Sequence, residues 1–227
     1  MANDTRARER LILWIGAAVS LWHLYINTLG TMSELYASAI HFGSFALLGA
    51  LLSSNSRLWS DLLIGLLGLC AGVYIIFAEQ PLYGRALSFT TLDWMFALAA
   101  IGVALELVRR TAGWFIPVII VVALSYVVWW GRYVGGVLHF PGLSMETVAF
   151  RSYFGSDGMF GPIARLSTTF VFMFILFGAF LVRSGASDFV IGVARALAHK
   201  VKGGPGFVAI FASALTGTVT GSAVANT

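Results

Sequence analysis

Long apolar runs separated by short polar breaks dominate the pattern of hydrophobic and polar positions along this chain. A helix needs about 20 mostly apolar residues to cross the hydrocarbon of a bilayer. Six runs come close to that length, at residues 11–29, 36–53, 58–78, 92–108, 114–130 and 163–182. The pattern therefore predicts an all-α polytopic membrane protein with about six transmembrane helices.

The first run is the one that a signal peptide would resemble, because Arg6, Arg8 and Arg10 precede it. Its apolar stretch is longer than the core of a signal peptide, and no convincing small-x-small cleavage site ends it. We therefore expect a retained helix.

A different periodicity follows the sixth run. Ser187 and Asp188 suit a helix N-terminus, and Gly203-Gly204-Pro205 stop the helix and start another. Between these signals one face is apolar and the opposite face is mostly polar: the apolar positions are Phe189, Val190, Val193, Leu197 and Val201, and the opposite ones are Asp188, Gly192, Arg195, His199 and Lys202. This spacing predicts an amphipathic helix at the membrane interface.

The final segment, residues 203–227, has no charged residue and mixes small, apolar and hydroxyl side chains. Such residues suit the start of a re-entrant hairpin, in which the backbone leaves helical geometry beside a polar cavity. Its neutral oxygens can coordinate a hard monovalent cation. The small and polar positions are Thr216, Gly217, Thr218, Thr220, Gly221, Ser222 and Asn226. Gly217 and Gly221 also form a GxxxG pattern, so a helix-packing seam is an equal alternative.

Composition supports the membrane class, since 59% of the residues are hydrophobic and 11% are charged, with a mean hydropathy of +0.87. The net charge of +4 does not indicate nucleic acid, because the Lys and Arg residues stand singly between apolar runs. With a cytoplasmic N-terminus, ten of the 14 basic residues fall on the cytoplasmic side. These ten are Arg6, Arg8, Arg10, Arg57, Arg109, Arg110, Arg183, Arg195, Lys200 and Lys202, and the other four are Arg85, Arg132, Arg151 and Arg165. The positive-inside rule favours this orientation.

Ionisable side chains in the first five runs lie at the run ends, at Asp61, Asp93 and Glu106, apart from His23 and His41. We interpret the two histidines as hydrogen-bonding between helices, with a proton site as the alternative. The four histidines show no metal-ligand spacing, and no Ser/His/Asp constellation indicates an enzyme. The single Cys70 excludes an intrachain disulfide, and no covalent cofactor is expected.

Three parts follow along the chain. Residues 1–113 form a scaffold, in which Gly65, Gly68 and Gly72 predict tight helix packing. Residues 114–160 hold a connecting helix and an extracytoplasmic loop, and residues 161–227 hold the sixth apolar run, the amphipathic helix and the start of the hairpin. In the loop, Ser144-Met145-Glu146-Thr147 predicts the start of a short helix, and the loop serves either as a docking surface or as a connector.

Several motifs, taken in order, resemble the fused permease of tripartite ATP-independent periplasmic (TRAP) transporters, in the TAXI-type branch. They are Glu106-Leu107-Val108-Arg109-Arg110-Thr111-Ala112-Gly113-Trp114, Thr169-Phe170-Val171-Phe172, Leu176-Phe177-Gly178-Ala179-Phe180-Leu181, Ser184-Gly185-Ala186 with Asp188-Phe189, Gly203-Gly204-Pro205, and Gly217-Thr218 before Gly221-Ser222-Ala223-Val224-Ala225-Asn226. Together they extend over most of the chain.

The resemblance implies a sodium-coupled importer of organic anions such as small dicarboxylates, in the bacterial inner membrane. A periplasmic binding protein would deliver the substrate. Residues 1–113 would correspond to a four-helix small subunit, and residues 161–227 to the incomplete start of the large elevator-type transport subunit fused to it. It places Gly221, Ser222 and Asn226 at the tip of the first hairpin and Gly217 and Thr218 on its first arm, with Thr220 between. Ser222 and Asn226 are the expected sodium ligands.

Permeases of this family continue past the position where this sequence ends. Because a midplane site needs both repeats of such a transporter, we expect this chain to require the rest of the large transport subunit. We therefore expect an N-terminal fragment. Two alternatives stay open: an accessory membrane scaffold without its own transport site, and another ion transporter with re-entrant hairpins.

Overall fold

A computed structural model describes residues 2–53, 58–198 and 204–220, and every secondary-structure element in these residues is helical. Six helical stretches are long and apolar enough to span a membrane: Arg6–Thr28, Glu34–Leu52, Leu58–Gly84, Thr91–Ala112, Phe115–Tyr133 and Pro162–Arg183. Each coincides with one of the six apolar runs. The predicted all-α polytopic membrane class is confirmed.

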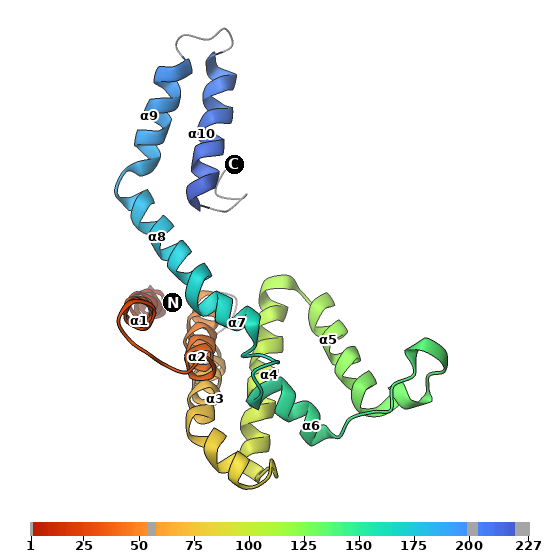
Figure 1. Ribbon diagram of the computed structural model, residues 1–227. Coiled ribbons are helices and arrows are strands. Elements are labelled where there is room, and N and C mark those ends of the chain that lie inside the picture. Colours follow the sequence, from red (N-terminus) through yellow and green to blue (C-terminus); the bar gives the residue numbers. More distant parts are fainter. Residues whose placement is uncertain (1, 54–57, 199–203, 221–227) are drawn as a thin grey trace. The chain divides into compact units, whose positions relative to one another are not determined.

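The helices follow one another with short connections (Figure 1). The α-helices are α1 (Ala2–Thr28), α2 (Glu34–Leu52), α3 (Leu58–Gly84), α4 (Thr91–Ala112), α5 (Phe115–Ser125), α6 (Met145–Ala149), α7 (Pro162–Leu166), α8 (Phe172–Arg183), α9 (Ala186–Ala198) and α10 (Gly204–Thr220). Five π or 3-10 segments complete them: η1 (Tyr126–Trp130), η2 (Gly131–Tyr133), η3 (Gly136–Leu138), η4 (Phe150–Phe154) and η5 (Ser167–Val171).

Local signals set several helix ends. Ser33 caps α2 by accepting a hydrogen bond from the Tyr36 amide, and Thr90 with Asp93 forms a capping box at the start of α4. Gly113 follows α4 with φ +76°, a left-handed conformation that glycine adopts without steric cost. The chain can therefore turn sharply from α4 into α5.

The closest helix packing joins α2 and α3 along the predicted glycine stripe. A Cβ atom added to Gly72 would lie 2.4 Å from the carbonyl oxygen of Ala39, and one added to Gly68 would lie 2.4 Å from the Ala46 Cβ. At Gly65 it would lie 2.8 Å from the Leu47 Cα. Only glycine allows this backbone approach, so the prediction of tight packing is confirmed.

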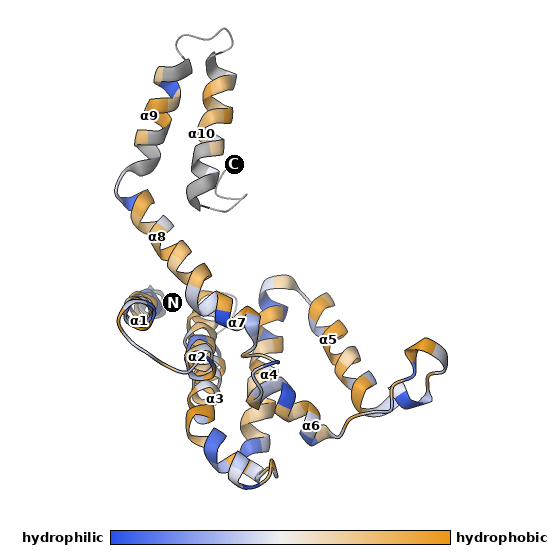
Figure 2. Cartoon of the chain, in the orientation of Figure 1, coloured by the Kyte–Doolittle hydropathy of each residue, from blue (hydrophilic) through white to orange (hydrophobic). Residues whose placement is uncertain are grey.

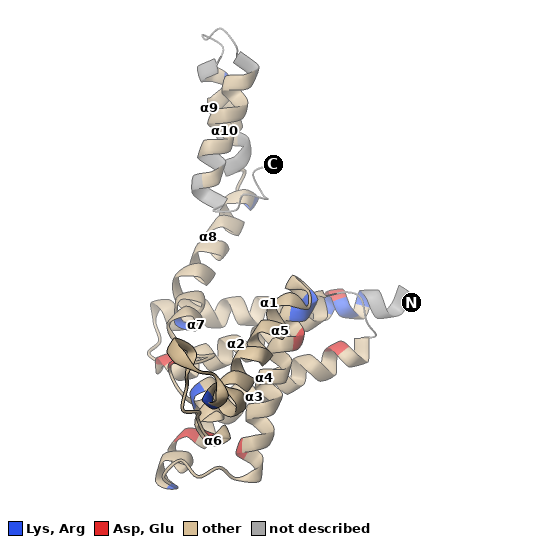
Figure 3. Cartoon of the chain, turned by 90° about the vertical axis from the view of Figure 1, so that its right-hand side faces the viewer, with Lys and Arg blue, Asp and Glu red and all other residues tan. Residues whose placement is uncertain are grey.

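The residues of the long helices are largely apolar, as Figure 2 shows most clearly for α5 and α8. Figure 3 shows long helical stretches without any charged residue. Large exposed apolar side chains include Leu63 on α3, Leu98 on α4 and Phe115 on α5. Exposed tryptophans lie near the ends of three spans, at Trp59, Trp114, Trp129 and Trp130. Apolar faces with aromatic residues toward their ends suit contact with lipid.

The second half of the predicted loop packs against the helices. Ser144 caps α6 by accepting from the Thr147 amide, which confirms the predicted short helix. Tyr153 of η4 is fully buried, and its hydroxyl donates to the carbonyl of Ala71, midway along α3. Burial raises the pKa of the Tyr153 phenol, which therefore stays protonated as a donor. Residues 145–160 are thus more than a connector, while a docking role for this loop stays a prediction.

By contacts between residues, the chain divides into two units, residues 1–168 and 169–227. The first holds α1 to α7, with a core of buried residues from α2, α3, α4 and the α6–η4 region. The second holds α8, α9 and α10, in which α9 and α10 lie side by side and antiparallel (Figure 1). The predicted division at residues 113 and 160 concerns function rather than contacts, and it stays a prediction.

Candidate functional site

The predicted ion and substrate segment begins on α10, a helix in which no residue is charged. Pro205 stands at its second position, where a missing N–H costs nothing, so the predicted fresh helix start is confirmed. Phe207 and Phe211, one turn apart, stack with ring centroids 4.8 Å apart. The helix packs along α9, the predicted amphipathic helix, whose last predicted positions His199, Val201 and Lys202 lie outside the described residues.

Three of the predicted site residues, Gly217, Thr218 and Thr220, lie in the last turn of α10. The backbone is helical at all three, so the expected departure from helical geometry does not occur in the described part of the segment. A helical first arm fits Gly217 and Thr218. The remaining predicted residues, Gly221, Ser222 and Asn226, lie outside the described residues. Their roles stay predictions.

A buried polar cluster joins α1, α2 and η5 in the first unit. His23 is completely buried and His41 is 9% exposed. His23 Nε2 lies 2.8 Å from His41 Nδ1, and His41 Nε2 lies 3.0 Å from the Ser167 hydroxyl. Asn27 Nδ2 donates to the carbonyls of His23, at 2.8 Å, and Thr168, at 3.2 Å. The interpretation of the two histidines as hydrogen-bonded between helices is confirmed.

The hydrogen-bond partners in this cluster determine which ring nitrogen of each histidine carries the proton. His23 Nδ1 lies 2.8 Å from the Val19 carbonyl, which only accepts, so Nδ1 carries the proton. In a neutral ring His23 Nε2 then accepts, which makes His41 Nδ1 the donor. His41 Nε2 accepts in turn, and the Ser167 hydroxyl donates. All four groups are satisfied with both rings neutral.

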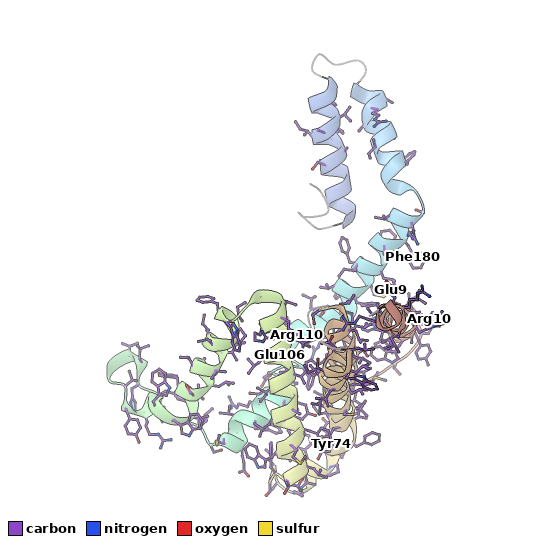
Figure 4. The ribbon with its side chains drawn as sticks, turned by 180° about the vertical axis from the view of Figure 1, so that it is seen from behind. Glu9, Arg10, Tyr74, Glu106, Arg110 and Phe180 are labelled. Atoms are coloured by element: carbon purple, nitrogen blue, oxygen red, sulfur yellow. The ribbon has the colours of Figure 1, made fainter. Side chains whose placement is uncertain are left out.

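A second polar cluster lies where the N-terminal ends of α1 and α3 meet the C-terminal ends of α2 and α4. Asp61 is fully buried and forms ion pairs with Arg8 and with Arg110, the latter at 2.8 Å. Arg110 also reaches the Ser53 hydroxyl at 3.0 Å. Glu106 binds Arg110 through Nε at 2.7 Å, and Figure 4 shows these two side chains together on α4. Ion pairs and hydrogen bonds of this cluster therefore link the ends of four helices.

A third cluster stabilises the opposite end of α3 and α4. Asp93 is fully buried and accepts from Arg85 at 2.7 Å, from Tyr74 at 2.8 Å and from Thr90 at 2.7 Å. Both buried aspartates are therefore compensated by cations and hydrogen bonds, as buried carboxylates require. Sequence analysis placed Asp61 and Asp93 at helix ends but missed their partners. Sequence spacing alone predicts only the ion pairs of Glu106 with Arg109 and Arg110, which follow it by three and four residues on the same helix.

Metal chemistry of the usual kind has no support in the part of the chain that the structure describes. Within residues 2–53, 58–198 and 204–220, no group of three or more His, Cys, Asp or Glu side chains is placed to hold a metal ion. Sodium binding by neutral oxygens belongs to a different class of site, because it needs carbonyl, hydroxyl and amide oxygens. The candidate for such a site is the segment from Gly217 to Asn226.

Comparison with known proteins gives one match. The family model described as "Tripartite ATP-independent periplasmic transporter, DctM component" matches residues 98–227. The matched region begins inside α4, continues through α10 and contains every residue of the predicted ion and substrate segment. No curated protein and no solved structure matches the chain.

Proposed function

The chain belongs to the DctM family of tripartite ATP-independent periplasmic (TRAP) transporters, and we propose that it couples the import of organic anions to sodium. Membership makes it a permease component of a transporter and not an enzyme. It is a multi-pass membrane protein, as its six apolar helices also indicate. TRAP permeases of this family work with a periplasmic binding protein and a small subunit.

The observation that carries the proposal is the family match over a charge-free segment rich in neutral oxygens. Residues 204–227 lie inside the match and contain Thr216, Thr218, Thr220, Ser222 and Asn226 without any charged residue. Hydroxyl, amide and carbonyl oxygens suit a sodium ion, and the end of a broken helix suits the carboxylate of an organic anion. We assign sodium to Ser222 and Asn226, with Gly217, Thr218, Thr220 and Gly221 forming the adjacent backbone.

We further propose that residues 1–113 are a small subunit fused to the large one, as in the TAXI-type branch. The family match begins at residue 98, while α1 to α4 pack in sequence and one buried ion-pair cluster connects the ends of all four. A scaffold of this kind stays fixed in the membrane. The transport part would then carry substrate by an elevator movement against it, after delivery by a periplasmic binding protein in the bacterial inner membrane.

Reconstituted uptake tests this function. A complete permease polypeptide that contains residues 1–227 is placed in liposomes, with its binding protein and a mixture of labelled organic acids outside. An inward sodium gradient should drive accumulation, and omission of the binding protein should abolish it. Accumulation driven by a proton gradient in the absence of sodium would contradict the coupling, and accumulation without the binding protein would contradict the delivery step.

A further inference from the structure

An apolar groove runs between α4 and α5. It consists of two adjoining cavities of about 430 and 220 Å³ that share Leu105. Gly102, Pro117, Val118 and Val121 line the larger one, and the smaller one continues to Met159 of the folded-back segment. Both walls belong to helices long and apolar enough to span a membrane. The apolar walls of the groove suit an acyl chain.

One end of the groove is basic and aromatic. Glu106, Arg109 and Trp114 line it, and the Arg109 guanidinium lies 5.1 Å from the centre of the Trp114 ring. Arg109 binds Glu106 through Nε at 2.7 Å and Nη2 at 2.8 Å. Among the described residues no hydrogen bond uses Arg109 Nη1, and the Arg109 side chain is 34% exposed. A donor on a partly exposed guanidinium group therefore remains at this end of the groove.

Positive charge at this end comes from Arg109 and Arg110, which both pair with the one carboxylate of Glu106. The first turn of α5 adds to it, because Trp114 makes no side-chain cap and the amides of Phe115 and Ile116 have no partner within the helix. The positive end of the α5 dipole thus lies beside the arginine. An anion is the complementary ligand.

We propose that this groove binds one anionic glycerophospholipid. Its acyl chain lies between α4 and α5, and its phosphate accepts from Arg109 next to the Trp114 ring. Aromatic side chains favour the headgroup level of a bilayer, and basic pockets between transmembrane helices take anionic headgroups. An apolar protein segment in the groove would fill the apolar part but would leave the Arg109 Nη1 donor unmatched.

Gly102→Leu tests the acyl-chain part of this proposal. A Cβ atom at Gly102 meets no atom within 4 Å, so leucine fills the groove without a clash at its base. Gly16→Leu is the matched control, because a Cβ there also meets no atom within 4 Å and Gly16 lies on α1. The complete permease polypeptide is incubated with equal amounts of phosphatidylglycerol and phosphatidylcholine, and retained lipid is counted by native mass spectrometry.

The parent and Gly16→Leu should retain one phosphatidylglycerol, and Gly102→Leu should lose it. Arg109→Gln should lower the preference for phosphatidylglycerol over phosphatidylcholine by about fivefold, the effect of one basic residue at a membrane surface. Equal retention of both lipids by the parent would overturn the anionic part of the proposal. Unchanged retention in Gly102→Leu, or no retained lipid in the parent because another segment occupies the groove, would overturn the site. Neither result depends on transport activity.

Discussion

At the scale of single residues, the hydrogen bonds of His23 and His41 distinguish a structural role from a proton path. The chain of donors runs from Ser167 through His41 and His23 to the carbonyl of Val19. A backbone carbonyl cannot pass a proton onward, so this chain ends inside the first unit. The arrangement favours a structural role, in which these hydrogen bonds hold α1, α2 and η5 together.

His41→Ala should therefore lower stability without changing coupling. The substitution leaves His23 Nε2 and the Ser167 hydroxyl without their partner, at a cost of about 1 to 3 kcal/mol for buried polar groups. Thermal unfolding in detergent measures the loss, and His139→Ala at an exposed histidine is the control. Sodium-driven uptake should keep its sodium dependence. Loss of that uptake at normal expression would reverse the interpretation and make the histidines part of an ion or proton path.

Asp61→Asn should destabilise the protein more than any exposed carboxylate change. Asp61 is fully buried between Arg8 and Arg110, and breaking a buried ion pair costs about 3 to 5 kcal/mol because it leaves charge uncompensated. Asp157→Asn at an exposed position is the matched control. The midpoint of thermal unfolding should fall clearly in Asp61→Asn and stay close to the parent in the control. Equal midpoints in the two variants would show that the pairs contribute no net stability.

At the scale of helices, the effect of a Gly→Ala substitution on stability can be compared between Gly72 on α3 and Gly102 on α4. Gly72→Ala adds a Cβ that would lie 2.4 Å from the Ala39 carbonyl, so α2 and α3 must separate. Forcing atoms into a packed contact costs about 1 to 3 kcal/mol. Gly102→Ala adds a Cβ that meets nothing within 4 Å, and the gain in helix propensity stabilises by about 0.5 to 1 kcal/mol. Opposite shifts in unfolding temperature are expected, and equal shifts would contradict the packing.

Local features of the helices could be predicted from the sequence, whereas long-range partners could not. Six spans, the Ser144 cap and the α3 glycine stripe follow from spacing within one element, because period and residue size determine them. The Asp61 ion pairs join residues that are 49 and 53 positions apart in the sequence. The hydrogen bond from Tyr153 to Ala71 spans 82 positions. Nothing in local spacing encodes such pairs. For the candidate site, the sequence predicted a fresh helix start at Gly203-Gly204-Pro205. The structure adds that this helix begins at Gly204 and continues through Thr220.

At the scale of the whole molecule, the ion-pair cluster groups helix ends on one side of the membrane. Arg8 near the start of the first span, Ser53 after the second and Arg110 at the end of the fourth connect through Asp61 or directly. Arg109 joins them through Glu106, so three of the six arginines of the first unit that are predicted to be cytoplasmic lie together, as an alternating path through six spans requires. Which side that is stays a prediction from the ten-to-four charge asymmetry.

Cysteine labelling tests this orientation. In a Cys70→Ala background, which removes the natural thiol, a cysteine at Asn3 should react with an impermeant reagent only from the cytoplasm. A cysteine at Gly136 should react only from outside, and its backbone is exposed there. The reverse labelling pattern would overturn the cytoplasmic N-terminus.

The proposed sodium and substrate site is the central claim, and a sodium titration of uptake tests it most directly. In a reconstituted family member that carries residues 217–226, Ser222→Ala and Asn226→Ala each remove one neutral oxygen ligand. The sodium concentration for half-maximal uptake should rise by about fivefold or more, corresponding to at least about 1 kcal/mol. Gly221→Leu should impair uptake further, since a bulky side chain obstructs close approach to the backbone. Unchanged sodium dependence in both alanine variants would contradict the site and assign the segment to helix packing.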